Sequence, residues 1–117
     1  MLVLLIEDDH EIRANLVELL GEEGLEVDGL ANAEDALVLL GAGQVPDVLV
    51  TDIDLGPGLD GVDLAEAAQA RHPDVGVVFI SGDPYDAHGH RLGAHERFLQ
   101  KPFKTSDLAA VIRDAAA

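Results

Sequence analysis

The chain contains no cysteine and few basic residues, and each shortage excludes a class of protein. Without cysteine it can form neither a disulfide framework nor a thiolate metal site. Seven lysines and arginines stand against 23 aspartates and glutamates, so the net charge is -16 at pH 7. A surface this acidic repels the nucleic-acid backbone, and we therefore expect no direct binding to DNA or RNA.

Long hydrophobic runs are also absent. The apolar segment at the start, residues 1–6, is too short for a signal peptide or a membrane span and leads straight into acidic residues. The chain has no linker, repeat or low-complexity tract, and its 117 residues suffice for one hydrophobic core. We therefore expect a single cytoplasmic domain over residues 1–117, without membrane association.

The few basic residues are unevenly placed. Residues 91–117 contain five of the seven lysines and arginines but only three of the 23 acidic residues. This last quarter is therefore mildly positive, while the rest of the chain is strongly negative. The asymmetry has two interpretations that the sequence leaves open, an ordinary solvated surface and a partner-binding face.

Short apolar segments alternate with segments of helical periodicity. Three of the apolar segments are almost continuously apolar, as buried strands are. Five apolar segments in all are typical of strands: residues 2–6, 25–30, 48–51, 75–80 and 98–100. In the first helical segment Ile12, Leu16, Leu19 and Leu20 share one face. Strands that alternate with helices predict a parallel sheet covered on both faces. We expect an α/β, flavodoxin-like doubly wound sheet of five parallel strands, in the order 2-1-3-4-5, with five helices.

Chemically reactive side chains follow the predicted strands at one end. Glu7 and Asp8 follow the first strand, Asp52 the third, Ser81 the fourth and Lys101 the fifth. In an open α/β sheet, ligands bind beyond the carboxyl ends of the strands, so these side chains are expected to converge. Carboxylates this close repel one another unless a cation neutralises them. Oxygen ligands favour Mg²⁺ over Zn²⁺, and the cluster therefore predicts a magnesium site.

Asp52 is the best placed nucleophile of this set, because it lies on the central strand between the acidic pair and Lys101. A carboxylate that attacks phosphorus forms an aspartyl phosphate and, being ionised at neutral pH, needs no general base. A metal ion and Lys101 would stabilise charge on the phosphoryl oxygens, and Ser81 would donate a hydrogen bond to one of them. Such a reaction would phosphorylate the chain itself.

In their order along the chain, these residues resemble the receiver domains of bacterial two-component response regulators. The resemblance covers essentially the whole length. Beyond the site residues it rests on short stretches that are weak alone and specific together: residues 4–8, 46–47, 57, 60–61, 80–82, 93–94 and 98–103.

The resemblance implies a ligand set for Mg²⁺. Asp8 would bind the ion directly and Glu7 through water. Asp52 and the main-chain carbonyl of Asp54 would be the remaining protein ligands. Asp9, one position beyond the pair, would start the first helix instead.

The resemblance also implies a phosphoacceptor and a switch. Asp52 would accept the phosphoryl group and Lys101 would contact it. Ser81 would be the switch hydroxyl, and Phe98 the switch aromatic whose ring turns inward when Ser81 moves toward the phosphate. An alternative that stays open is that Phe98 is an ordinary core residue. The bond between Lys101 and Pro102 would be cis.

As a member of this family the chain would act in a phosphorelay as a stand-alone receiver. It would be phosphorylated by a sensor histidine kinase or a histidine phosphotransfer protein and would catalyse only its own phosphorylation and dephosphorylation. It would signal by binding another protein or, as an alternative, drain phosphate from another regulator. In the family the fourth helix, fifth strand and fifth helix form the signalling face, which corresponds here to residues 84–117. Pro84, Gly89 and Gly93 predict that this fourth helix is short or irregular.

The sequence also allows three other interpretations of its function and metal binding. A pseudo-receiver would keep the fold without phosphorylation, but retention of the whole site argues against it. A haloacid-dehalogenase-type phosphatase also forms an aspartyl phosphate, but in that family the Asp-x-Asp motif follows the first strand and the acidic pair comes last. In this chain the acidic pair comes first, so the order of the motifs argues against that family. A zinc site from His88, His90 and His95 is less favoured than solvated loop histidines.

Overall fold

The structure is a computed structural model that describes residues 1–53, 60–84 and 91–116. Its strands and helices alternate along the chain, apart from the two consecutive strands β4 and β5. In order they are β1 Leu2–Ile6, α1 His10–Glu22, β2 Glu26–Leu30, α2 Ala33–Gly41, β3 Val48–Asp52, α3 Gly61–Arg71, β4 Gly76–Ser81, β5 Glu96–Gln100 and α4 Thr105–Ala116.

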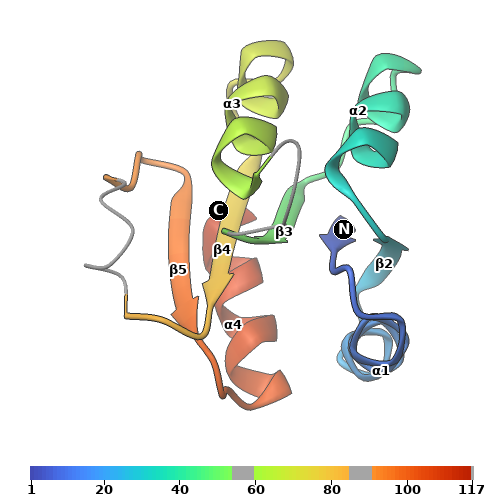
Figure 1. Cartoon of the computed structure of the whole chain (residues 1–117), viewed down its shortest axis with the longest axis vertical. Helices are drawn as coiled ribbons and strands as arrows, with labels where there is room; N and C mark the ends of the chain where they lie inside the picture. Colours follow the sequence, from blue (N-terminus) through green and yellow to red (C-terminus); the bar gives the residue numbers. More distant parts are fainter. Residues whose placement is uncertain (54–59, 85–90, 117) are drawn as a thin grey trace.

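The strands form one parallel sheet in the order β2-β1-β3-β4-β5, which confirms the predicted topology. Helices α1 and α4 cover one face, and α2 and α3 cover the other (Figure 1). The sheet is therefore doubly wound: the connections from β1 to β2, from β2 to β3 and from β3 to β4 pass over its faces as helices α1, α2 and α3.

The core consists of two layers, one on each side of the sheet. Successive strand residues point to opposite faces, so β1 sends Val3 and Leu5 toward α1 and α4 but Leu4 and Ile6 toward α2 and α3. The same alternation runs through β3 and β4, whose residues are almost all buried. Burial on both faces explains why these segments are continuously apolar in the sequence.

Helices α1 to α4 are the helices of the described residues, one fewer than the five expected. The other predicted helix, expected to be short or irregular, would fall between β4 and β5, where residues 85–90 lie outside the described part of the chain. Its described flanks, residues 82–84 and 91–95, are not helical. No helix in the described residues is long and apolar enough to cross a bilayer.

One side chain of α1 lies differently from the prediction. Leu16 and Leu20 are buried as expected, but Ile12 is 44% exposed. Ile12 belongs to the first turn of the helix, whereas the buried pair comes one and two turns later. Helical spacing alone therefore overestimated the length of the buried face.

Candidate functional site

The strand register brings the acidic residues of β1 and β3 together. Ile6 pairs with Thr51 in the two neighbouring parallel strands, so the residues that follow them, Glu7 and Asp52, come level with each other. Lys101 directly follows β5, and its amide N–H donates to the carbonyl of Ser81 at 2.7 Å. The carboxyl ends of β1, β3, β4 and β5 thereby meet at one place, as predicted.

Lys101 contacts both acidic partners. Its Nζ lies 3.0 Å from Oδ1 of Asp52 and 3.6 Å from Oε2 of Glu7. The side chains of Glu7 and Asp52 are only 6% and 13% exposed, while that of Lys101 is 36% exposed. The ammonium group therefore closes over two carboxylates that are largely removed from water, where charges interact more strongly.

Three carboxylates form a group suited to a cation. Glu7, Asp8 and Asp52 each offer an oxygen, and these oxygens lie within 4.8 Å of one another. Glu7 is buried and Asp8 is exposed, so the group opens to solvent on the side of Asp8. Hard oxygen donors with one open side fit Mg²⁺, which retains several waters when proteins bind it.

Asp9 lies beside this group but serves the helix. Its side chain caps α1 by accepting the N–H of Ile12 at 3.0 Å, as predicted. Its own N–H donates to Oε1 of Glu7 at 3.2 Å. The start of α1 thus helps to orient Glu7 toward the site.

Gly61 lies against the main chain of Asp52. Its N–H donates to the carbonyl of Ile53 at 2.9 Å, and Asp60 and Asp63 form a capping box at the start of α3. A Cβ added at Gly61 would lie 2.1 Å from the carbonyl oxygen of Asp52. The first turn of α3 therefore packs directly on the Asp52 backbone, and only glycine allows that approach.

A cavity of about 170 Å³ opens beside Asp52. It is bounded by Asp52, Ser81, Asp83 and Lys101, together with Ile80 and Gly82. The Oγ of Ser81 accepts the N–H of Asp83 at 3.0 Å, and Ser81 is 7% exposed. A water molecule occupies roughly 30 Å³ of liquid, so the cavity has room for several groups of that size.

The electrostatics of the site distinguish Glu7 from Lys101. Burial, reinforced by the neighbouring charge of Asp52, raises the pKa of Glu7 from 4.5 to about 7, although the Asp9 N–H opposes the shift. Partial burial alone would lower the pKa of Lys101, but its hydrogen bond to Asp52 and the charges of Asp52 and Glu7 raise it instead. Lys101 therefore stays cationic, whereas Glu7 titrates near neutral pH in the metal-free protein.

This raised pKa predicts a pH dependence of stability. Folded Glu7 binds its proton more tightly than unfolded Glu7 between pH 4.5 and about 7, so its contribution to the free energy of unfolding falls as the pH rises through that interval. The expected loss is about 3 kcal/mol. Denaturant unfolding of metal-free wild type and Glu7→Gln across the interval measures it, because the other acids titrate in both proteins. Parallel pH profiles would contradict the prediction.

The remaining predicted site residues have different outcomes. The bond between Lys101 and Pro102 is cis, as predicted. Phe98 pairs with Phe79 across β4 and β5 and packs, partly buried, against the core layer under α2 and α3; its switch role stays a prediction. Asp54 lies outside the described residues.

Two of the three histidines considered for zinc, His88 and His90, also lie outside the described residues. Nε2 of His95 is 3.9 Å from Oδ1 of Asp74, whose side chain is fully exposed. The zinc alternative thus stays an untested prediction.

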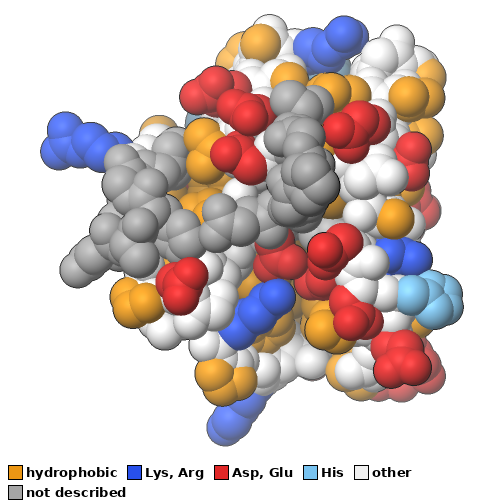
Figure 2. All heavy atoms as spheres, in the orientation of Figure 1, with side chains coloured by type: hydrophobic (Ala, Val, Ile, Leu, Met, Phe, Trp, Pro, Cys, Tyr) orange, Lys and Arg blue, Asp and Glu red, His pale blue; other side chains and the backbone are white. Residues whose placement is uncertain are grey.

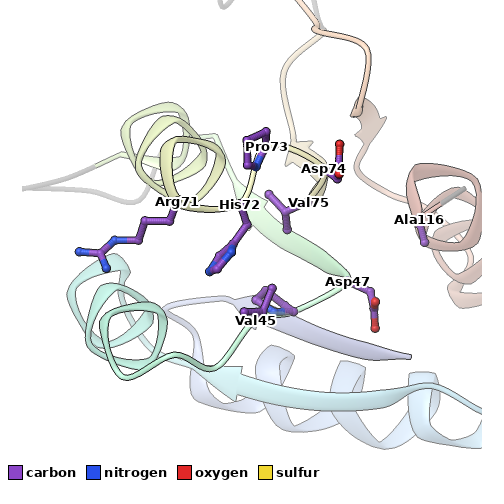
Figure 3. A pocket seen from close by; sticks show the side chains of 9 residues that line it. Val45, Asp47, Arg71, His72, Pro73, Asp74, Val75 and Ala116 are labelled. Atoms are coloured by element: carbon purple, nitrogen blue, oxygen red, sulfur yellow. The ribbon is translucent and has the colours of Figure 1, made fainter.

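A larger cavity, of about 470 Å³, lies at the opposite end of the sheet (Figure 3). It is lined by residues 45–47 and 71–75, which precede β3 and β4, and by Ala116. The charged side chains of Asp47, Arg71 and Asp74 point in different directions in Figure 3. They do not converge on a common point, and the smaller cavity beside Asp52 is therefore the candidate site.

Acidic side chains crowd the face of the molecule drawn in Figure 2, and basic ones are fewer and scattered.

The sequence does not predict that a basic residue, Arg13, lies beside the acidic pair. Its Nη1 donates to the carbonyl oxygen of Glu7 at 2.8 Å. The glycine at position 29, in the middle of a strand, was the one sequence signal of a close approach there.

The sequence matches the family model described as response regulator receiver domain over residues 3–113. One similar curated protein is the sensor kinase CckA of Brucella abortus (strain 2308), which is 34% identical over 116 residues. That alignment covers 96% of this chain and 12% of the kinase. The chain spans about a quarter or less of the length of this and other curated relatives.

Two of the similar solved structures illustrate the shared fold. A response regulator receiver protein from Sinorhizobium medicae WSM419 superposes with a TM-score of 0.90 at 24% identity, over 99% of this chain and 94% of that chain. The receiver domain of the hybrid histidine kinase CckA superposes with a TM-score of 0.80 at 29% identity, over 100% of both chains.

Proposed function

Because the chain belongs to the response regulator receiver domain family of two-component phosphorelay systems, we propose that its Asp52 accepts a phosphoryl group from a phosphohistidine. The observation that carries the proposal is the contact between Asp52 and Lys101 at 3.0 Å, at the edge of an open cavity and beside two further carboxylates. A nucleophile, a fixed cation and a ligand set for a metal ion are thereby within reach of one phosphoryl group.

The chemistry follows from the roles of these side chains. A carboxylate oxygen of Asp52 forms a bond to phosphorus as the bond from phosphorus to the donor imidazole nitrogen breaks, and that nitrogen then takes up a proton from solvent. Lys101, kept cationic by Asp52 and Glu7, offers its ammonium group to the phosphoryl oxygens. Ser81 lines the same cavity and supplies a hydroxyl donor.

Mg²⁺ fits the carboxylates of Glu7, Asp8 and Asp52, and when bound it supplies positive charge for the phosphoryl oxygens. The three carboxylates in turn depend on neutralisation, since burial and the charge of Asp52 already raise the pKa of Glu7 to about 7. In this proposal Asp8 is the direct ligand and Glu7 acts through water, with the Asp54 carbonyl as a further ligand.

The phosphodonor in this proposal is a sensor histidine kinase or a histidine phosphotransfer protein, in the cytoplasm. Support comes from the likeness to the receiver domain of the hybrid histidine kinase CckA, 29% identical over the whole chain. Phosphorylated Asp52 would draw Ser81 toward it and bias an existing equilibrium between two conformations, with Phe98 following. The output would be binding of a protein at the 84–117 face, without nucleic acid or membrane.

Intact-mass spectrometry after incubation with a small-molecule phosphodonor tests the proposed function. We expect one phosphoryl group per chain when Mg²⁺ is present and little when it is chelated. The adduct should be lost on treatment with hydroxylamine, which cleaves acyl phosphates. A stable adduct that resists hydroxylamine, or no adduct at any Mg²⁺ concentration, would contradict the proposal and favour the pseudo-receiver.

A further inference from the structure

Arg13 connects the first turns of α1 to the end of β1. Its Nη1 donates to the carbonyl oxygen of Glu7 at 2.8 Å, and its Nη2 lies 3.1 Å from Nδ1 of His10. The carbonyl of Glu7 belongs to the peptide bond that leads to Asp8. The guanidinium therefore holds the peptide between the two members of the acidic pair.

A glycine in the neighbouring strand makes room for this contact. Gly29 of β2 pairs with Leu5 of β1, two residues before Glu7. A Cβ at Gly29 would lie 3.0 Å from Cγ and 3.3 Å from Cδ of Arg13, and 2.9 Å from Cγ2 of Val17. The aliphatic part of Arg13 thus crosses the bare backbone of Gly29 on its way to Glu7.

We propose that Arg13 is a positioning residue for the acidic pair: by holding the Glu7 carbonyl, it keeps the Asp8 carboxylate turned toward Asp52. The need for such a restraint follows from charge. Asp8 is exposed, and its repulsion by Asp52 and Glu7 favours conformations in which it turns into solvent. A charge-assisted hydrogen bond on the preceding peptide opposes that movement. The inference rests on the proposed function, because it concerns the same cation site.

When Arg13 is replaced by an uncharged residue, the loss of its positioning role and the loss of its positive charge should change the affinity for Mg²⁺ in opposite directions. Removing a positive charge from a protein of net charge -16 should by itself strengthen the binding of Mg²⁺. Loss of a group that orients metal ligands should weaken it, by about tenfold or more. A variant that lacks the guanidinium therefore separates the two effects by the direction of the change.

The test compares two arginine-to-methionine variants, which keep most of the aliphatic stem. Arg13→Met removes the bond to Glu7, and Arg113→Met removes a similar bond from Arg113 to the carbonyl of Glu23, at the other end of α1. Mg²⁺ titrations followed by backbone amide chemical shifts give the Kd of each protein. We expect the Kd of Arg13→Met to rise about tenfold and that of Arg113→Met to stay within about twofold of wild type.

Thermal unfolding of both variants distinguishes positioning from a general loss of fold. If Arg13→Met is too unstable to titrate, Gly29→Ala displaces the same side chain and should raise the Kd about threefold. An unchanged or lower Kd in Arg13→Met overturns the inference and leaves the proposed function intact. Absence of Mg²⁺ binding in wild type, together with absence of phosphorylation, would overturn both.

Discussion

Asp52→Asn is expected to abolish phosphoryl incorporation, with a rate at least about a hundredfold below that of wild type. The amide is uncharged and has no oxygen nucleophilic enough to displace a phosphohistidine. The substitution also removes one carboxylate from the cation group and the negative charge that Lys101 contacts. Burial is the main cause of the raised pKa of Glu7 and remains in the variant, but the charge of Asp52 also contributes, so that pKa should fall below its wild-type value.

Intact mass with the small phosphodonor gives the incorporation, and carboxyl NMR gives the pKa of Glu7. Asp83→Asn is the matched control, because Asp83 lines the same cavity and the change in charge is identical. That variant should still take up one phosphoryl group. Incorporation into Asp52→Asn at a rate close to that of wild type would show that another residue is the acceptor.

Gly61→Ala is expected to lower the free energy of unfolding by about 3 kcal/mol and to slow phosphoryl incorporation by about a hundredfold. The new methyl group would lie 2.1 Å from the carbonyl oxygen of Asp52 and 3.1 Å from Cα of Ile53, so main chain must move. No flexible side chain is present to absorb the clash. The movement displaces Asp52, the proposed acceptor, which explains the large effect expected on the rate.

Gly21→Ala in α1 is the control for Gly61→Ala. A Cβ there would have no neighbour within 4 Å, and alanine favours the helix by about 1 kcal/mol. Denaturant unfolding should therefore show opposite signs for the two substitutions, and only Gly61→Ala should affect phosphoryl incorporation. Equal stability of the two variants would mean that α3 can shift away from Asp52 without cost.

Local patterns determined most of the fold. Continuous apolar segments identified β1, β3 and β4, because strands buried on both faces need apolar residues at every position. The edge strands were less clear: β5 begins at Glu96 rather than at residue 98, since a buried glutamate does not look like part of a strand. Asp9 was recognised as a helix cap because capping is a contact between near neighbours in the sequence.

The site followed from the same patterns and one rule of topology. Once the sheet is parallel, the residues that follow its strands must meet at one edge. This rule brought Glu7, Asp52 and Lys101 together before any distance was known. The sequence could name these residues because their positions depend on chain order and strand direction alone.

Only the tertiary structure decided how each of these side chains is surrounded. Glu7 and Asp8 are adjacent in the sequence, yet one is buried with a pKa of about 7 and the other is exposed. The contact of Gly61 with Asp52, and that of Arg13 across Gly29, join residues from different elements. Periodicity records which face of an element points inward. It does not record which atoms of another element lie opposite, and those atoms set the burial, the pKa and the space available to each residue.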